Sequence, residues 1–198
     1  MNKFLQKVLA LLDATRKADF LAPLVMRLYL VPVFWQAGTT KYQNFPDTVE
    51  WFGDMMSGLN LPFPWLMAFL ATATELVGAG SLLLGLGMRW MCIPLLFTMF
   101  MAIATVHWPN GWLAISEGMG PFATDRTMQA IDRLDEAKDI LMQYGDYDRL
   151  TEFGHLVILN NGIEFAVTYA IMLLALFFTG AGRYVSVDYW VRRRIQAS

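Results

Sequence analysis

The chain has 198 residues, of which 56% are hydrophobic and 16% are charged, and its formal net charge is −2. The hydrophobic share exceeds the roughly 45–50% that is usual for soluble domains, which excludes a disordered chain. There is no surplus of Lys and Arg to neutralise a phosphate backbone, so nucleic-acid binding is not expected. One Cys excludes an intramolecular disulfide, and together with two His it supplies too few ligands for a closed structural zinc site. We therefore predict no metal site.

The N-terminal segment starts with Lys3 and Lys7 and contains a short apolar run at 8–12. A secretory signal peptide also starts in this way, but its apolar core is longer and is followed by a small-residue cleavage pattern. We expect the segment to be retained. Its apolar residues recur at helical spacing, which predicts an amphipathic helix lying in the membrane interface; they are Phe4, Leu5, Val8, Leu11 and Leu12.

Four apolar runs are long enough to cross about 30 Å of hydrocarbon at roughly 1.5 Å per residue. They cover about residues 21–38, 63–87, 90–108 and 156–181. A soluble bundle is the alternative, but each of its helices would need a polar outer face, and parts of these runs are apolar all round. The sequence therefore predicts an all-α integral membrane four-helix bundle that forms a single domain over residues 1–198.

The longest polar stretch is the third loop, which we place at residues 109–154. It contains a predicted amphipathic helix, Asp125 to Tyr144, whose apolar face is formed by Met128, Ile131, Leu134 and Leu141. The loop also carries nine acidic residues between Glu117 and Glu152, so it suits an exterior cap over the bundle better than binding to anionic lipid.

The distribution of Lys and Arg predicts the orientation, because cytoplasmic loops are enriched in these residues. Nine cations flank the spans on one side, and five lie in the loops on the other side. Both termini are therefore expected in the cytoplasm of a bacterial inner membrane. The nine are Lys3, Lys7, Arg16, Lys17, Arg89, Arg183, Arg192, Arg193 and Arg194, and the five are Lys41, Arg126, Arg133, Lys138 and Arg149.

Three ionisable residues interrupt the predicted spans: Arg27, Glu75 and Glu164. Such residues are costly in a bilayer, usually face the bundle interior, and often mark function. Counted by helical rise, Arg27 lies about 9 Å and Glu75 about 18 Å from the inner ends of their spans, so we expect the two to pair. A purely structural role, in which the pair only holds helices together, is equally compatible with the pattern.

A second group of polar residues lies toward the predicted outer ends of the spans. We interpret it as a small-molecule or partner site, because it exceeds what one helix–helix contact needs, although a structural role stays open. His107 is equally well explained as an interfacial anchor beside Trp108. Together with the pair beneath it, the candidate ligand-binding set is Arg27, Gln36, Lys41, Glu75, His107, Asn160, Asn161 and Glu164, and no catalytic residue is assigned.

Several longer motifs resemble the DoxX family of small four-helix membrane proteins. They are an Arg early in the first span, Gly38-Thr-Thr-Lys41, the glycine-rich run from Glu75 to Arg89, and the run from Gly180 to Asp188. Three further runs resemble the HvfX-type branch of that family, whose members are encoded beside copper-responsive, oxazolone-containing modified peptides and their maturation enzymes. These runs are Val33 to Gly38, Val106 to Ile115 and Val157 to Phe165.

The resemblance implies an inner-membrane protein that takes part in the maturation, handling or export of a copper-binding modified peptide. The implied partners are the lipid bilayer and the peptide or its maturation proteins, and a homo-oligomer is compatible with it. DoxX relatives are linked to membrane redox functions, so quinone is the cofactor that the resemblance suggests. Three function classes follow: an accessory protein that binds a small molecule or the peptide, a quinone-linked oxidoreductase subunit, and a structural assembly factor.

Overall fold

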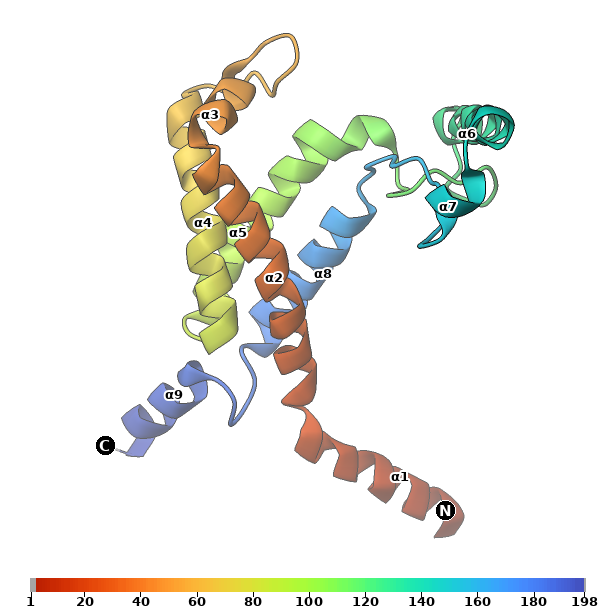
Figure 1. The fold of residues 1–198 in the computed structure, drawn as a ribbon. Coiled ribbons are helices and arrows are strands. Elements are labelled where there is room, and N and C mark those ends of the chain that lie inside the picture. Colours follow the sequence, from red (N-terminus) through yellow and green to blue (C-terminus); the bar gives the residue numbers. More distant parts are fainter. Residues whose placement is uncertain (1–2, 198) are drawn as a thin grey trace. The chain divides into compact units, whose positions relative to one another are not determined.

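The computed structural model describes residues 3–197, and this part of the chain is helical without β-strands (Figure 1). It forms two compact units. Unit 1 comprises residues up to 98 and from 169 onward, and unit 2 comprises residues 99–168. The helices are α1 (Lys3–Thr15), η1 (Arg16–Ala18), α2 (Leu21–Gln43), α3 (Phe45–Gly53), α4 (Pro64–Leu84), α5 (Met88–Ala102), η2 (Ile103–His107), η3 (Trp108–Asn110), α6 (Asp125–Tyr144), α7 (Tyr147–Thr151), α8 (Glu164–Thr179) and α9 (Val187–Ala197).

Helices α2 and α4 pack along each other in unit 1, and α3 also packs on α4 (Figure 1). The contact between α2 and α4 is close at Gly38, where a Cβ atom would lie 2.8 Å from Cγ of Leu76. Helix α4 approaches α5 in a similar way, since a Cβ on Gly78 would lie 2.7 Å from Leu95. Small residues at such points let membrane helices approach closely, which increases van der Waals contact where lipid offers no hydrophobic driving force.

Three helices are long and apolar enough to cross a membrane: Leu21–Gln43, Pro64–Leu84 and Met88–Asn110. They coincide with the first three predicted spans. The first continues five residues beyond its predicted end at residue 38, and this extension places Lys41 inside the helix. The third begins as α5, passes through a single π-helical turn, η2, and ends in the short 3₁₀ turn η3.

The fourth predicted span, residues 156–181, is helical only from Glu164 to Thr179. These 16 residues rise about 24 Å, which is less than the roughly 30 Å of a hydrocarbon core. The preceding residues are extended because their backbone N–H groups bond to another loop instead of starting a helix, and Asn161 adopts a positive φ of 59°. A fourth span over residues 156–181 is therefore not confirmed, and its helical part is shorter than predicted.

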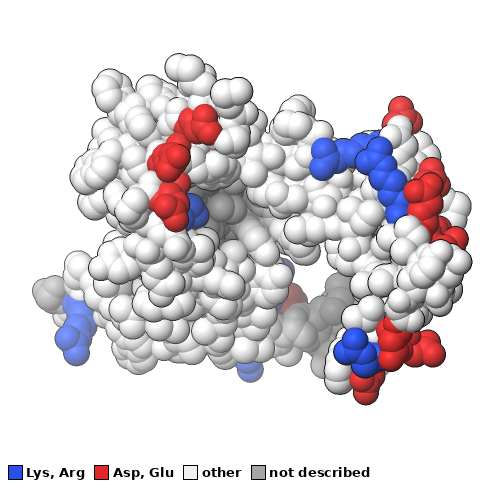
Figure 2. Space-filling view, turned by 45° about the horizontal axis from the view of Figure 1, so that its top comes forward, with Lys and Arg blue, Asp and Glu red and all other residues white. Residues whose placement is uncertain are grey.

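Large apolar side chains lie exposed along the candidate spans. Val77 is 61% exposed, Phe97 is 61% exposed and Phe100 is 63% exposed. Figure 2 shows wide uncharged areas on the face in view, with Lys, Arg, Asp and Glu gathered in separate patches. Exposed apolar surface of this kind is unfavourable in water and marks a face that contacts lipid or another protein.

Unit 2 contains the predicted loop helix, and α6 has the bounds that the sequence indicated, Asp125–Tyr144. Its start is defined by a capping box, in which Thr124 and Thr127 bond each other's backbone N–H groups. These bonds satisfy donors that a helix N-terminus otherwise leaves without partners. The helix itself is confirmed, whereas its position outside the membrane stays a prediction.

Helix α1 is also confirmed as a helix, and its side chains from Phe4 onward are exposed. Phe4 is 73% and Leu11 is 71% exposed, as an interfacial helix requires, but its location at the membrane stays a prediction. Helices α3 and α9 were not expected from the sequence. Helix α9 starts after Ser186, whose hydroxyl accepts the N–H of Tyr189 and so caps the helix.

Candidate functional site

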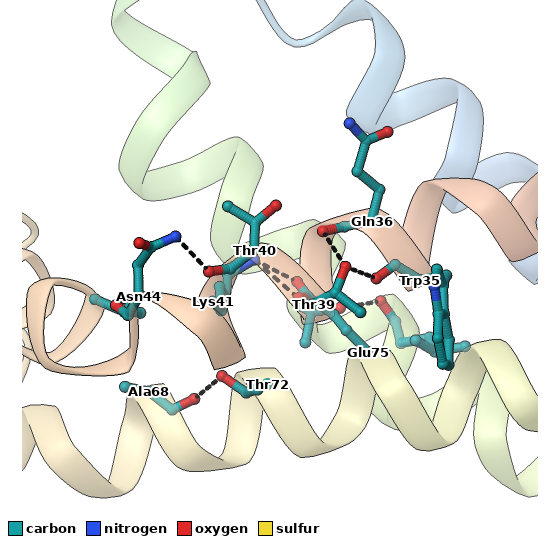
Figure 3. A network of polar contacts seen from close by, with 12 residues as sticks. Trp35, Gln36, Thr39, Thr40, Lys41, Asn44, Ala68, Thr72 and Glu75 are labelled. Atoms are coloured by element: carbon teal, nitrogen blue, oxygen red, sulfur yellow. Dashed lines mark hydrogen bonds and ion pairs between the residues drawn. The ribbon is translucent and has the colours of Figure 1, made fainter.

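The strongest candidate in unit 1 is an ion pair between Lys41 on α2 and Glu75 on α4 (Figure 3). The Lys41 Nζ atom lies 2.8 Å from both carboxylate oxygens of Glu75. The Glu75 side chain is only 6% exposed, and that of Lys41 is 25% exposed. Both residues lie in candidate membrane spans, where a charged residue is a functional-site candidate by default.

The polar residues around this pair do not contribute further hydrogen bonds to it. Thr72 donates to the carbonyl of Ala68, and Thr39 donates to the carbonyl of Trp35, each within its own helix. Gln36 lies one turn before Thr39, and its side chain points away from the pair (Figure 3). In the described part of the chain the two charged groups are thus each other's only hydrogen-bond partners, and Lys41 retains donor capacity for an additional group.

Arg27 does not pair with Glu75, which corrects the prediction from the sequence. The residue is 1% exposed, and its guanidinium donates to four backbone carbonyls. Two belong to the last turn of α4, at Leu82 and Leu83, and two belong to the turn after α8, at Ala181 and Val185. The last carbonyls of a helix have no partner within it, so Arg27 satisfies groups that would otherwise be buried without a bond. We assign it a structural role.

The prediction failed because it placed the inner ends of the first two spans at the same level. In the structure the end of α4 is level with Arg27, six residues into α2, and Glu75 is level with Gly38 and Lys41. The axial separation between Arg27 and Gly38 is about 16 Å at 1.5 Å per residue, so the Glu75 carboxylate is out of reach. The acid that acts electrostatically on Arg27 is instead Asp188.

Two further residues of the DoxX-like motifs, Gly85 and Asp188, stabilise the end of unit 1 around Arg27. Their roles are not indicated by the sequence. Gly85 ends α4 with φ 64°, and a Cβ there would lie 2.8 Å from Cζ of Arg27, so only glycine fits both the turn and the guanidinium. Asp188 accepts the N–H groups of Gly87 and Met88 at 2.7 and 3.0 Å. It therefore caps the start of α5 from a distant part of the sequence, a role that local pattern does not reveal.

Unit 2 brings together His107 and the two predicted asparagines. His107 Nδ1 and Asn110 Nδ2 lie 2.9 and 3.1 Å from the backbone oxygen of Asn161. A carbonyl only accepts, so Nδ1 of His107 carries a proton in this contact, and in the neutral imidazole Nε2 then presents a lone pair. The side-chain amide of Asn160, which is 2% exposed, donates to the carbonyls of Asn110 and Leu113.

Glu164 belongs to the same part of unit 2. One of its carboxylate oxygens accepts the N–H of Ala114 at 3.0 Å. Backbone N–H groups from Asn160 to Glu164 donate to carbonyls between Gly111 and Ala114, and an isolated β-bridge links Ile115 with Leu159. We call these two bonded segments, residues 107–116 and 158–164, the loop junction. Gly162 is required here, because a Cβ would lie 2.4 Å from the carbonyl oxygen of Leu113.

Arg126 was missed as a member of this site. It lies in the first turn of α6, and its Nε donates to the side-chain oxygen of Asn160 at 3.0 Å. The residue was counted only as a loop cation, and no local signal indicates its partner 34 positions away. The sequence also does not reveal η2, the π-helical turn that ends at His107. Such turns occur frequently at functional sites, so η2 is a further signal that this region is functional.

The eight predicted site residues thus take part in separate arrangements. Lys41 and Glu75 form the ion pair of unit 1, and Arg27 ties helix ends in the same unit. Gln36 joins neither of these groups through its side chain. The remaining four, which are His107, Asn160, Asn161 and Glu164, belong to the loop junction of unit 2. Within residues 3–197 no group of three or more His, Cys, Asp or Glu is placed to hold a metal ion.

An all-helical chain with three apolar spans and an ion pair buried inside them is a membrane protein. Residues 22–108 match the sequence model of the DoxX family, so this stretch is a DoxX family domain. The domain includes Arg27, the Lys41–Glu75 pair and His107. No curated protein sequence and no solved structure matches the chain.

Proposed function

We propose that this protein is an HvfX-type member of the DoxX family in a bacterial inner membrane, with both termini in the cytoplasm. In this proposal it is an accessory in the maturation, handling or export of a copper-binding, oxazolone-type modified peptide. It would bind the peptide or a small molecule through polar groups near the exterior. The DoxX family domain supports the membrane setting, and the three longer runs of the chain support the particular branch.

The observation that carries the proposal is the loop junction. Two of the three runs that resemble the HvfX-type branch, 106–115 and 157–165, lie far apart in sequence but are joined by backbone and side-chain hydrogen bonds. The residues of these runs therefore form one local structure. A shared site explains why both runs carry polar residues in an otherwise apolar region.

The chemistry of the loop junction suits a peptide or a heterocycle. His107 offers Nε2 as an acceptor or as a ligand for copper that the peptide brings, because its Nδ1 is engaged by the carbonyl of Asn161. Glu164 uses one carboxylate oxygen on the N–H of Ala114, which leaves the second for a donor on the bound molecule. Arg126 and Asn160 connect α6 to this structure and fix its position.

The decisive experiment compares function with stability in variants of the loop junction. Glu164→Gln keeps volume and hydrogen bonding but removes charge, and His107→Gln removes the Nε2 lone pair. Copper tolerance and modified-peptide yield of the host are measured together with the membrane level and thermal stability of each purified variant. Glu117→Gln, at an exposed position, is the matched control for loss of one acid.

We expect Glu164→Gln to reduce peptide yield at unchanged stability, with a smaller effect for His107→Gln because His107 also suits an anchoring role. Glu117→Gln should leave both measurements unchanged. If peptide yield follows stability across all variants, the loop junction only holds the chain together, and the protein is a structural assembly factor. A host whose copper tolerance is independent of the protein contradicts the peptide role itself.

A second candidate function, a quinone-linked oxidoreductase subunit, is favoured by the Lys41–Glu75 pair. Buried acid–base pairs in membrane spans serve as proton relays, and quinone reduction takes up protons with its electrons. The electrons would come from a partner protein, since the sequence has no haem, flavin or iron–sulfur fingerprint. Quinone that co-purifies with the protein, together with a redox-difference spectrum that Glu75→Gln abolishes, would support this function. Purification without quinone would exclude it.

A further inference from the structure

Unit 1 contains a cavity of about 460 Å³ whose role is not explained by the ion pair or by the loop junction. It lies where α2 begins, α5 begins and α8 ends, and α9 forms another side. Its charged lining residues come from four different segments of the chain: Asp19, Arg89, Arg183, Asp188 and Arg192. The volume falls within the range of about 300–1,000 Å³ that is typical of small-molecule sites.

The cavity lies at the depth where a bilayer places its headgroups. Two candidate spans start beside it, at Leu21 and Met88, so it is located at the ends of the apolar segments. Aromatic residues gather at the same level, where Tyr189 contacts the rings of Tyr184 and Trp190 at 5.2 Å each. Tyr and Trp are enriched at membrane–water interfaces, which supports this position.

The two acids in the lining are already neutralised or bonded. Asp19 pairs with Arg183, with Nη2 of the arginine 2.6 Å from Oδ1. Each carboxylate oxygen of Asp188 accepts a backbone N–H at the start of α5. The hydrogen bonds that Arg183 donates to Asp19 also raise the pKa of Arg183. Both acids in the lining are thus already engaged by groups of the chain itself.

The other two arginines retain donors toward the cavity. Arg89 uses Nη2 on the carbonyl of Phe178 and has further N–H groups, since a guanidinium carries five. Arg192 is exposed on α9 and makes no hydrogen bond or ion pair within the described chain. Planar guanidinium groups bind phosphate oxygens in pairs, so Arg89 and Arg192 favour a phosphate over a carboxamide or a cation.

One wall of the cavity is apolar and belongs to the start of α2. Phe20, Pro23 and Met26 line it at steps of three residues along the chain. A soluble phosphate needs no such wall, whereas a lipid presents an acyl chain directly beside its phosphate. The cavity thus combines two cations with an apolar surface, at the end of membrane-spanning helices.

We propose that this cavity binds the phosphate of an anionic glycerophospholipid, with Arg89 and Arg192 on the phosphate and an acyl chain along Phe20, Pro23 and Met26. The site is separate from the ion pair and from the loop junction, so it does not rest on the proposed function. Bound lipid connects the start of α2, the start of α5 and α9, and thereby stabilises this end of unit 1.

The test uses the full chain in a non-ionic detergent, with lipid binding followed by native mass spectrometry. Phosphatidylglycerol is titrated against phosphatidylcholine, whose choline group the arginines would repel. We expect the unaltered protein to prefer phosphatidylglycerol, and Arg89→Gln and Arg192→Gln to weaken its binding by about fivefold each, as expected for one basic residue at an anionic lipid surface. The matched control is Arg194→Gln, on the same helix but outside the cavity lining.

Three results would each overturn the proposal. The first is equal binding of both lipids by the unaltered protein. The second is a loss of binding in Arg194→Gln as large as that in Arg192→Gln, and the third is displacement of the lipid by inorganic phosphate at the same concentration. The last result would identify a free anion as the ligand. Because Arg192 is exposed and makes no hydrogen bond or ion pair within residues 3–197, Arg192→Gln is expected to fold and to keep the test decisive even if Arg89→Gln does not.

Discussion

Arg27 and Lys41 lie on one helix, and their different partners explain why only one of them is a candidate for function. The guanidinium of Arg27 is surrounded by carbonyl groups and holds α4 to the turn after α8. The ammonium of Lys41 contacts a single carboxylate and is partly exposed. A fully bonded buried group contributes to the fold, whereas the ion pair of the buried Glu75 remains accessible to a ligand or a proton through the partly exposed Lys41.

The first prediction concerns the Lys41–Glu75 pair. Glu75→Gln leaves the Lys41 charge inside a span without a partner, and removal of one member of a buried pair costs about 3 kcal/mol or more. The double variant Glu75→Gln/Lys41→Gln should recover part of this loss. Thermal unfolding of the detergent-solubilised protein measures both. As a control, the double variant Glu75→Gln/Arg27→Gln should lose about the sum of the stability losses of its two single variants, because these two residues make no contact. If Arg27→Gln instead restores stability to Glu75→Gln, the assignment of the pair is contradicted.

The second prediction concerns the shape of the Arg27 side chain. Arg27→Lys keeps the charge, but an ammonium cannot direct donors to four carbonyls on two segments. Each hydrogen bond to a charged group contributes about 1.5–3 kcal/mol, so we expect a loss of at least about 2 kcal/mol in the free energy of unfolding. Arg194→Lys, at an exposed position, should change stability by less than about 0.5 kcal/mol. Equal stability of Arg27→Lys and the unaltered protein would show that charge alone suffices.

At the scale of elements, the clearest difference from the prediction is the start of α8, which begins at Glu164 and not at residue 156. Its first N–H groups donate to carbonyls of the 111–114 segment, so the helix is capped by a loop from another part of the chain. This arrangement shortens the helix, and it places Glu164 in the first helical turn. A continuous helix from residue 156 would have separated these groups and lost the loop junction.

The third prediction tests the close approach of the two segments in the loop junction. Gly162→Ala places a methyl group 2.4–2.6 Å from three backbone oxygens, which cannot move as a flexible side chain does. We expect a loss of more than about 2 kcal/mol in stability and faster proteolysis in the 109–163 region. Gly80→Ala is the control, because nothing lies within 4 Å and alanine favours a helix interior by about 1 kcal/mol. Comparable stability of the two variants would contradict the geometry of the junction.

At the scale of the whole molecule, the three candidate spans and the distribution of cations bear on orientation. The proposed topology places the third loop outside and the C-terminus in the cytoplasm. The chain offers a simple probe for it, because its single cysteine, Cys92, is fully buried and should not react with an added reagent.

The fourth prediction therefore uses introduced cysteines at residues 135 and 195. Asp135→Cys should react with an impermeant thiol reagent in intact spheroplasts, whereas Ile195→Cys should react only after the membrane is permeabilised. The unaltered protein, which carries only Cys92, is the control for background labelling. Equal labelling of both positions in intact spheroplasts would refute the proposed topology.

Composition, length and local pattern were sufficient for a large part of the fold. An apolar run of about 20 residues predicts a membrane span because the thickness of the bilayer sets the length, and this succeeded for α2, α4 and the span that starts at Met88. Helix α6 was found with its bounds, since its apolar residues repeat with the helical period. These features depend on neighbours along the chain and on the solvent.

Only the tertiary structure decided which charges meet. The partner of Glu75 depends on the register of two antiparallel helices, and that register is set by where α4 ends and by the contact of Gly38 with Leu76. The hydrogen bonds of Asn160 and Asp188 join residues that are 34 to 101 positions apart in the sequence. A helical repeat relates only residues a few positions apart, so it cannot predict these bonds. The sequence alone thus determined that polar groups lie within an apolar chain, because hydropathy is a property of each residue. Their pairing required the folded chain, because hydrogen bonds and ion pairs act only over a few ångströms.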